Sequence, residues 1–251
     1  MIIRFLQLGF IVSLAVLTSC SSVTGIDNFG NFRSEISDES LSQDTKELFK
    51  LNAAVLTFRD QKENYSSSLY LPEDLQSFYY DIQVHIAASE TGKEYSTITS
   101  ATRVFESTNL NELLLKPKKD YPFVERWEKG LIYTGVNEID ELLQKNDFYV
   151  KSLLDLHNSN LPIFILKRDQ PINTLIITRE LPKTGYFKYV GTNGFSGPST
   201  DINFERKNAF LEVSYKVCTG GSISGCTRPE IYTFKVLQDG EVIFEGKNIN
   251  L

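Results

Sequence analysis

The N-terminal segment most constrains what this chain can fold into. It lacks the polar face that a helix on the surface of a globular domain turns to solvent. Arg4 is the only charged residue before position 20, and residues 5–16 form an apolar run interrupted by Gln7, Gly9 and Ser13. A basic start followed by an apolar stretch of this length is typical of a secretory signal peptide. A membrane-spanning helix takes about 20 apolar residues, so the run is short for one. We therefore expect the segment to be removed; a buried or retained N-terminal helix is the alternative.

The residues that end this segment resemble the lipobox of bacterial lipoproteins. Leu17, Thr18, Ser19 and Cys20 supply a branched apolar residue, two small residues and a cysteine, in that order. The resemblance covers the first 20 residues only and implies cleavage after residue 19 and lipidation of the Cys20 thiol. Two or three acyl chains, such as palmitate, hold a protein firmly on a membrane. Ser21 stands where Asp would favour the inner membrane, so the resemblance implies the outer membrane of a two-membrane cell envelope.

Charge and composition narrow the functions open to the chain. Asp and Glu number 32 against 26 Lys and Arg, which gives a net charge of -6. An acidic surface repels phosphate backbones, so we expect no nucleic-acid partner. The chain has 2 His, 3 Cys and 1 Met, little raw material for metal or thiol chemistry, and we expect no cofactor and no metal. Hydrophobic residues make up 41% of the chain, enough for a buried core.

The mature chain divides into three regions by composition and periodicity. Residues 20–45 are rich in Gly, Ser, Asn and Asp and predict a flexible tether. Residues 46–160 predict a mixed α+β region, mostly strand from Lys46 to Ser107. Alternating residues from Tyr80 to Ile86 favour a hairpin with a turn near Gly92, and a helix starting at Pro72 is the competing interpretation. Three further helical segments are expected: one over Leu113 to Leu115 with Ser107 or Thr108 as N-cap, one over 122–127, and one over 137–157. A break of the third helix near Asn146-Asp147 is the alternative to a continuous one.

Residues 161–251 predict strand after strand. Asp239-Gly240 between two alternating apolar runs is a strong hairpin signal. We expect an α+β chain that is predominantly antiparallel β, ending in a β-sandwich of immunoglobulin-like size over residues 161–251. The seven candidate strands are 163–166, 174–178, 186–190, 202–204, 210–217, 231–237 and 242–244.

Two cysteines remain once Cys20 is lipidated. Cys218 and Cys226 flank a Gly/Ser-rich loop in a chain that we expect to reach an oxidising compartment, so they predict a disulfide. Closing a loop of about nine residues would stabilise the fold by ~2.5 kcal/mol in the chain-entropy model. Two unrelated reduced thiols are the alternative.

Residues able to carry catalysis are few. His85 and His157 are the only candidates for a histidine base, and no Gly-x-Ser-x-Gly nucleophile motif accompanies them. Carboxylate pairs could hydrolyse glycosidic bonds without histidine. On an acidic protein, however, such pairs usually belong to a solvated helix face. Two pairs have helical spacing: Glu125 with Glu128, and Glu138 with Glu141.

These observations favour a lipid-anchored, non-enzymatic envelope protein that binds another envelope protein or polymer through loops. The alternatives are an envelope hydrolase that acts on peptidoglycan or polysaccharide through paired carboxylates, and a carrier of a hydrophobic ligand. Loops carry function disproportionately because they lie on the surface of a rigid scaffold. The candidate binding loops contain Gly191, Asn193, Phe195, Gly220, Ser222 and Ile223.

Overall fold

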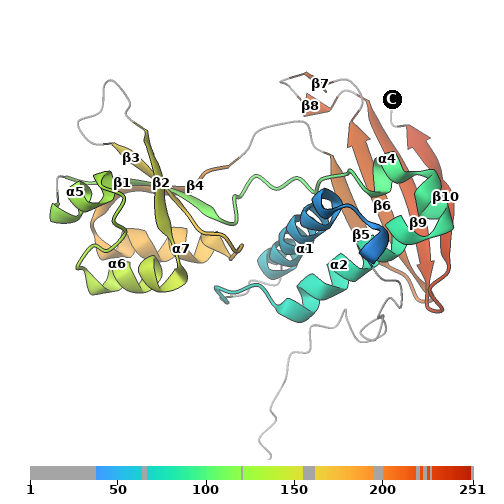
Figure 1. The fold of residues 1–251 in the computed structure, drawn as a ribbon, viewed down its shortest axis with the longest axis horizontal. Coiled ribbons are helices and arrows are strands. Elements are labelled where there is room, and N and C mark those ends of the chain that lie inside the picture. Colours follow the sequence, from blue (N-terminus) through green and yellow to red (C-terminus); the bar gives the residue numbers. More distant parts are fainter. Residues whose placement is uncertain are drawn as a thin grey trace, which may run out of the picture. The chain divides into compact units, whose positions relative to one another are not determined.

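Two four-stranded antiparallel sheets carry the fold, with strand orders β2-β3-β1-β4 and β10-β9-β6-β5 (Figure 1). The structure, a computed structural model, describes residues 38–63, 67–119, 121–154, 162–194, 200–218, 221–222, 225–226 and 228–249. The expected signal peptide, the lipobox and most of the tether lie outside these residues, so lipidation of Cys20 stays a prediction. The α+β class and the antiparallel strands are confirmed.

Helices, rather than the predicted strands, occupy residues 43–99. They are α1 (Gln43–Glu63), α2 (Glu73–Ala88), α3 (Glu90–Glu94) and α4 (Ser96–Thr99), preceded by a 3-10 turn at Asp38–Ser40. The expectation of mostly strands here was wrong because residues 52–58 are all buried, and a helix buried all round shows no amphipathic period.

The predicted hairpin over Tyr80 to Ile86 was also wrong, and the competing helix from Pro72 is what forms. Two of the polar residues that gave the alternation, Gln83 and His85, are buried in the helix with their own partners. Gln83 donates to the Tyr79 carbonyl at 2.8 Å, and His85 Nε2 lies 2.5 Å from the Gly240 carbonyl oxygen. Once hydrogen-bonded, a polar side chain can be buried, so polarity did not mark the solvent side here.

The second sheet follows the predicted strands closely. It contains β5 (Asp201–Arg206), β6 (Phe210–Cys218), β9 (Pro229–Leu237) and β10 (Val242–Ile249). Asp239-Gly240 joins β9 to β10 as expected, with Gly240 at φ 89°, a backbone conformation that glycine adopts without strain. Helix α2 packs on this sheet, since the rings of Tyr79 and Phe204 meet edge to face at 5.0 Å.

The first sheet draws on both sides of residue 161. It contains β1 (Glu112–Pro117), β2 (Tyr149–Leu154), β3 (Ile163–Lys167) and β4 (Phe187–Thr192). Strand β1 replaces the helix predicted at Leu113 to Leu115. Strand β2 ends the helical pattern that was predicted to run from 137 to 157.

Three helices accompany this sheet: α5 (Pro122–Glu128), α6 (Asn137–Leu142) and α7 (Thr174–Glu180) (Figure 1). Helix α5 confirms the helix predicted at 122–127, whereas α7 replaces the strand predicted at 174–178. The buried ring of Trp127 anchors their shared core, with Phe164 at 5.2 Å and Phe187 at 6.0 Å between ring centroids.

Residues 161–251 therefore do not form a sandwich of their own. Strands β3 and β4 pair with β1, and β3 also pairs with β2, whereas the later strands β5, β6, β9 and β10 form the other sheet. The described residues from 38 to 249 belong to one compact unit that contains both sheets.

Candidate functional site

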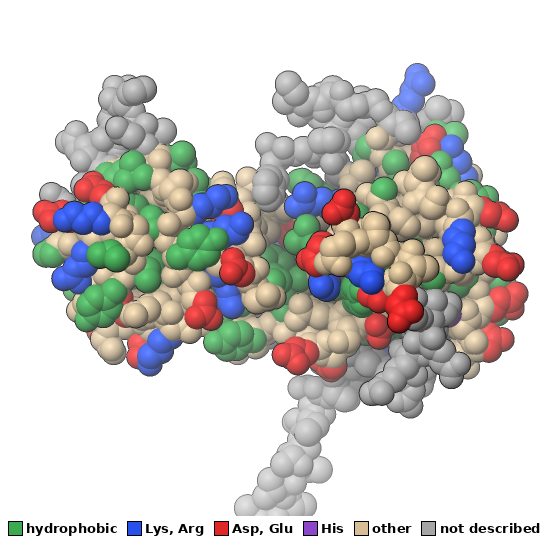
Figure 2. All heavy atoms as spheres, in the orientation of Figure 1, with side chains coloured by type: hydrophobic (Ala, Val, Ile, Leu, Met, Phe, Trp, Pro, Cys, Tyr) green, Lys and Arg blue, Asp and Glu red, His purple; other side chains and the backbone are tan. Residues whose placement is uncertain are grey.

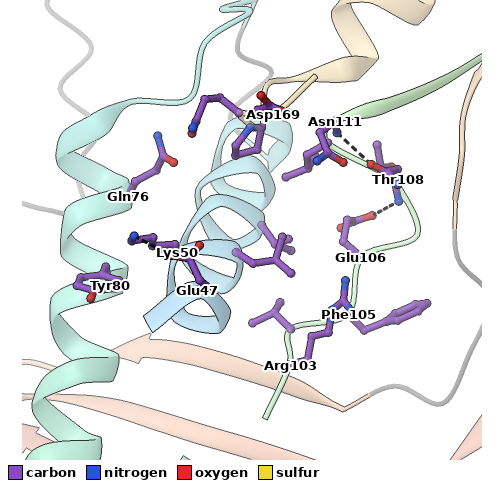
Figure 3. A pocket seen from close by; sticks show the side chains of 18 of the residues that line it. Glu47, Lys50, Gln76, Tyr80, Arg103, Phe105, Glu106, Thr108, Asn111 and Asp169 are labelled. Carbon is purple, nitrogen blue, oxygen red and sulfur yellow. Dashed lines mark hydrogen bonds and ion pairs between the residues drawn. The ribbon is translucent and has the colours of Figure 1, made fainter. Parts of the chain in front are cut away.

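A cleft of about 1130 Å³ is the candidate functional site (Figure 3). Four stretches of chain supply most of its lining: one side of α1, the start and middle of α2, the segment 103–112 that leads into β1, and residues 167–171 at the end of β3. Thr200, which precedes β5, completes the lining. These stretches are far apart in sequence, so the cleft exists only in the folded chain.

One buried amide holds the segment 103–111 against the helices. Asn52 of α1 is fully buried, and its Nδ2 donates to the Gln83 side chain and to the Thr102 carbonyl, both at 2.9 Å. Its Oδ1 accepts from the backbone N–H of Val104 at 2.8 Å. A buried amide with its bonds made is stabilising and specific, because every alternative placement would leave polar groups unpaired. Asn52 thereby positions one wall of the cleft.

A charged cluster ties the same wall to the second sheet. The Arg59 guanidinium donates to the Asp201 carboxylate at 2.9 Å and to the Phe105 carbonyl. Its Nε lies 3.7 Å from the Glu106 carboxylate, whose side chain is 10% exposed. Arginine suits such a junction because its planar fork carries five donors. The Glu106 charge at the edge of the cleft is thus compensated from within the protein.

Glu112 is a second compensated carboxylate on the cleft wall. Its side chain is 9% exposed, and it accepts from Lys151 Nζ at 2.5 Å and from Asn193 Nδ2 at 2.7 Å. Burial raises the pKa of the Glu112 carboxyl, but the hydrogen bonds from Lys151 and Asn193 outweigh burial, and the net pKa lies below its usual value. Glu112 is therefore ionised at neutral pH and unsuited to protonating a leaving group.

Asn109 presents a donor to the cleft. Its Oδ1 accepts from the backbone N–H groups of Asn111 and Glu112, each at 3.0 Å, and its carbonyl accepts from Thr174 Oγ1 at 2.7 Å. With the oxygen committed to this turn, the side-chain Nδ2 has no hydrogen-bond acceptor in the described part of the chain. Figure 3 shows the neighbouring Asn111 and Thr108 on the same wall.

Charges around the cleft are mixed in sign. Glu47 and Lys50 of α1 pair with each other at 3.1 Å. On the face drawn in Figure 2, Lys and Arg side chains lie among Asp and Glu side chains rather than in one patch. A surface of alternating sign creates no strong field for a highly charged ligand.

None of the loop residues predicted from sequence is among the described residues that line this cleft, although Asn193 contacts Glu112, which does line it. Gly191 is part of strand β4 and pairs with Leu114 of β1, and Asn193 follows that strand and bonds to Glu112. Ser222 is in the two-residue strand β7 (Gly221–Ser222), which pairs with β8 (Gly225–Cys226). Three other candidates lie outside the described residues: Phe195, Gly220 and Ile223.

The predicted disulfide involves a side chain outside the described part of the structure. Cys218 ends strand β6, and only the backbone of Cys226 is described, within β8. The pairing of Cys218 with Cys226 therefore stays a prediction.

The catalytic candidates do not gather in the cleft. His85 is buried against the β9–β10 turn, and His157 lies outside the described residues. Within the described ranges, no three His, Cys, Asp or Glu side chains lie close enough together to hold a metal ion. The paired carboxylates are exposed on short helices, away from the residues that line the cleft: Glu125 and Glu128 on α5, and Glu138 and Glu141 on α6.

The cleft itself was missed by sequence reasoning. Its one local signal is the segment from Ser107 to Asn111, in which every residue except Leu110 is polar and uncharged. The sequence instead favours Ser107 or Thr108 as the N-cap of a helix. Of the residues the structure describes, none belongs to a helix with the length and apolar character to cross a bilayer. Comparison with known proteins finds no family model, no curated protein and no solved structure that matches this chain.

Proposed function

We propose that this chain is a lipid-anchored envelope protein that binds an envelope component in its cleft without chemical conversion. The observation that carries the proposal is the state of the cleft's polar groups. Its buried carboxylates are held in ion pairs, whereas amides such as Asn109 Nδ2 are left without partners in the described chain. Convergent polar groups on a largely preformed apolar hollow are typical of a binding site.

The state of Glu112, the carboxylate held by Lys151 and Asn193, favours binding over hydrolysis. Glycoside hydrolysis takes a general acid whose pKa is raised so that it is protonated near neutral pH. The pKa of Glu112 is instead lowered by the net effect of its partners Lys151 and Asn193. The proposal therefore keeps the non-enzymatic interpretation and moves the site from the loops to the cleft.

The point at which the chain enters the fold suits a tethered binder. Asp38 accepts from the Tyr80 hydroxyl at 2.6 Å and pairs with Lys46 at 3.2 Å, and the Tyr80 side chain lines the cleft. Asp38 is 18 positions after Cys20. A chain of that length spans at most about 60 Å. A lipid on Cys20 would thus restrict the cleft to ligands near the membrane.

A photo-crosslinking pair tests the proposal in living cells. A photoreactive amino acid is placed at Leu51, which lines the cleft, or at Leu175 on α7, which does not; both side chains are 37% exposed. We expect an envelope component to be captured from position 51 and not from position 175. Capture of the same species from both positions, or of none from position 51, contradicts a binding function for the cleft.

A further inference from the structure

Most of the uncommitted polar side chains of the cleft are uncharged. The side chains of Ser77, Thr108, Asn111 and Gln170 form no hydrogen bond within the described chain, and they join the free Nδ2 of Asn109. Amides and hydroxyls both donate and accept. Together they match a ligand that also presents donors and acceptors close together, as the adjacent hydroxyls of a sugar ring do.

The charged groups of the cleft leave little for a charged ligand. Glu47 pairs with Lys50, and Glu106 and Glu112 are held by Arg59 and Lys151. Asp81 and Arg103 also line the cleft, and both interact with other groups of the protein. Two cleft residues of opposite sign, Lys167 and Asp169, form no ion pair among the described residues, and their charges balance. A strongly anionic or cationic ligand would have to displace a partner of Glu106 or Glu112. Breaking a buried ion pair is unfavourable, because it leaves an uncompensated charge.

An extended peptide has no strand to pair with in this cleft. Peptides commonly bind by adding a strand to a free sheet edge. The strands that reach the cleft are β1, through Glu112, and β3, through Lys167, and both are inner strands of their sheet. Their hydrogen-bonding edges are already occupied, so the backbone complementarity that a peptide would use is absent from the described wall.

Apolar surfaces complete the cleft. The rings of Tyr80 and Phe105 and the side chains of Leu51, Leu110 and Pro171 line it beside the amides. Aromatic rings with apolar faces and polar neighbours suit ligands whose own faces are apolar and whose rims are polar. A pyranose ring has that distribution, with C–H groups on its faces and hydroxyls around its edge.

We infer that the cleft binds a neutral glycan several sugar rings long. Its volume of about 1130 Å³ lies above the range of about 300–1,000 Å³ that is typical of small-molecule pockets. The cleft therefore has room for more than one sugar ring. The inference rests on the proposed binding function and adds the class of ligand. N-acetylated and plain sugars share the hydroxyl chemistry, and the experiment distinguishes them.

Calorimetric titration of the full chain tests this inference, in a detergent without a sugar headgroup. The probes are the tetramer of N-acetylglucosamine, maltotetraose and an uncharged Ser/Ala peptide of similar mass. We expect one of the two glycans to bind and the peptide not to bind. In the double variant Asn111→Ala/Gln170→Ala we expect that affinity to fall about tenfold, because two hydrogen bonds to the ligand are lost.

The matched control removes two exposed amides far from the cleft lining, Gln238→Ala/Asn248→Ala, and should bind as the parent does. Equal loss in both double variants, binding of the peptide alone, or no binding of either glycan at millimolar concentration overturns the inference. Capture of a protein from position 51 in cells, with no glycan bound in solution, would retain the binding function and reject the glycan.

Discussion

The phenol of Tyr215 lies in the core of the second sheet without a hydrogen-bond partner among the described residues. The side chain is fully buried, and its ring meets Phe234 edge to face at 5.6 Å. An unsatisfied buried hydroxyl costs about 1–3 kcal/mol. We expect Tyr215→Phe to raise the free energy of unfolding by about 1 kcal/mol, measured by urea denaturation.

Tyr79→Phe is the matched comparison for Tyr215→Phe. Tyr79 is also buried, but its hydroxyl donates to the Asp60 carboxylate at 2.8 Å. Its removal should lower the free energy of unfolding by about 1–2 kcal/mol. Equal losses in the two variants would show that the Tyr215 hydroxyl makes a hydrogen bond.

Glu112 makes the stability of the fold depend on pH. Its pKa is lowered in the folded chain, where the bonds from Lys151 and Asn193 outweigh burial. A carboxyl whose folded pKa is lowered contributes stability above its unfolded pKa of about 4.3, and this contribution is lost as pH falls through the folded pKa. We expect Glu112→Gln to cost about 2 kcal/mol at pH 7 and to match the parent once the pH has fallen below the folded pKa of Glu112. The test is the midpoint of urea denaturation of the parent and of Glu112→Gln, measured from pH 7 into acid. A difference in midpoint that stays constant with pH refutes the expectation.

At the scale of whole elements, the sequence predicts strands well where one face of a sheet is buried. In β6, Val213 and Tyr215 are buried and Ser214 between them is not, which is the alternation that marked the strand. Helix α1 shows no such contrast, since Asn52 is as buried as Phe58. Hydrophobic periodicity arises where an element has one face on the core and one in solvent. An element surrounded by protein on all sides therefore shows no such periodicity.

Asn52 carries the prediction that belongs to helix α1. Asn52→Leu keeps a similar volume but leaves the Val104 N–H and the Thr102 carbonyl unpaired inside the protein. We expect a loss of about 2–4 kcal/mol in the free energy of unfolding. We also expect faster hydrogen exchange at the Val104 amide. Thr57→Val is the control, because Thr57 is equally buried on the same helix and its Oγ1 has no partner among the described residues. It should be neutral or stabilising, and a loss as large as that of Asn52→Leu argues against the amide's role.

At the scale of the whole molecule, the anchor and the cleft differ in how far sequence predicts them. The motif that resembles a lipobox consists of four consecutive residues, Leu17 to Cys20. It can therefore be recognised from the sequence alone. The cleft brings Leu51, Tyr80, Asn109 and Gln170 together from four separate stretches of chain. Pairing β1 with β3 and packing α1 against α2 place them side by side. No local pattern encodes that proximity, because it follows from the strand order of the sheet.

The predicted attachment of the whole molecule to a membrane would depend on the thiol of Cys20. Replacement by serine removes the sulfur to which the lipid would be joined, so Cys20→Ser should incorporate no radiolabelled palmitate. Since the uncut apolar segment could still hold the variant on the membrane, a second chain begins at Ser21 behind an ordinary cleavable signal peptide. It should partition into the aqueous phase on detergent phase separation, whereas the parent enters the detergent phase, because each buried CH₂ contributes about 0.8 kcal/mol to membrane binding. Ser21→Ala in the parent chain is the control and should keep the label. Palmitate on Cys20→Ser, or aqueous partitioning of the parent, would reject the anchor.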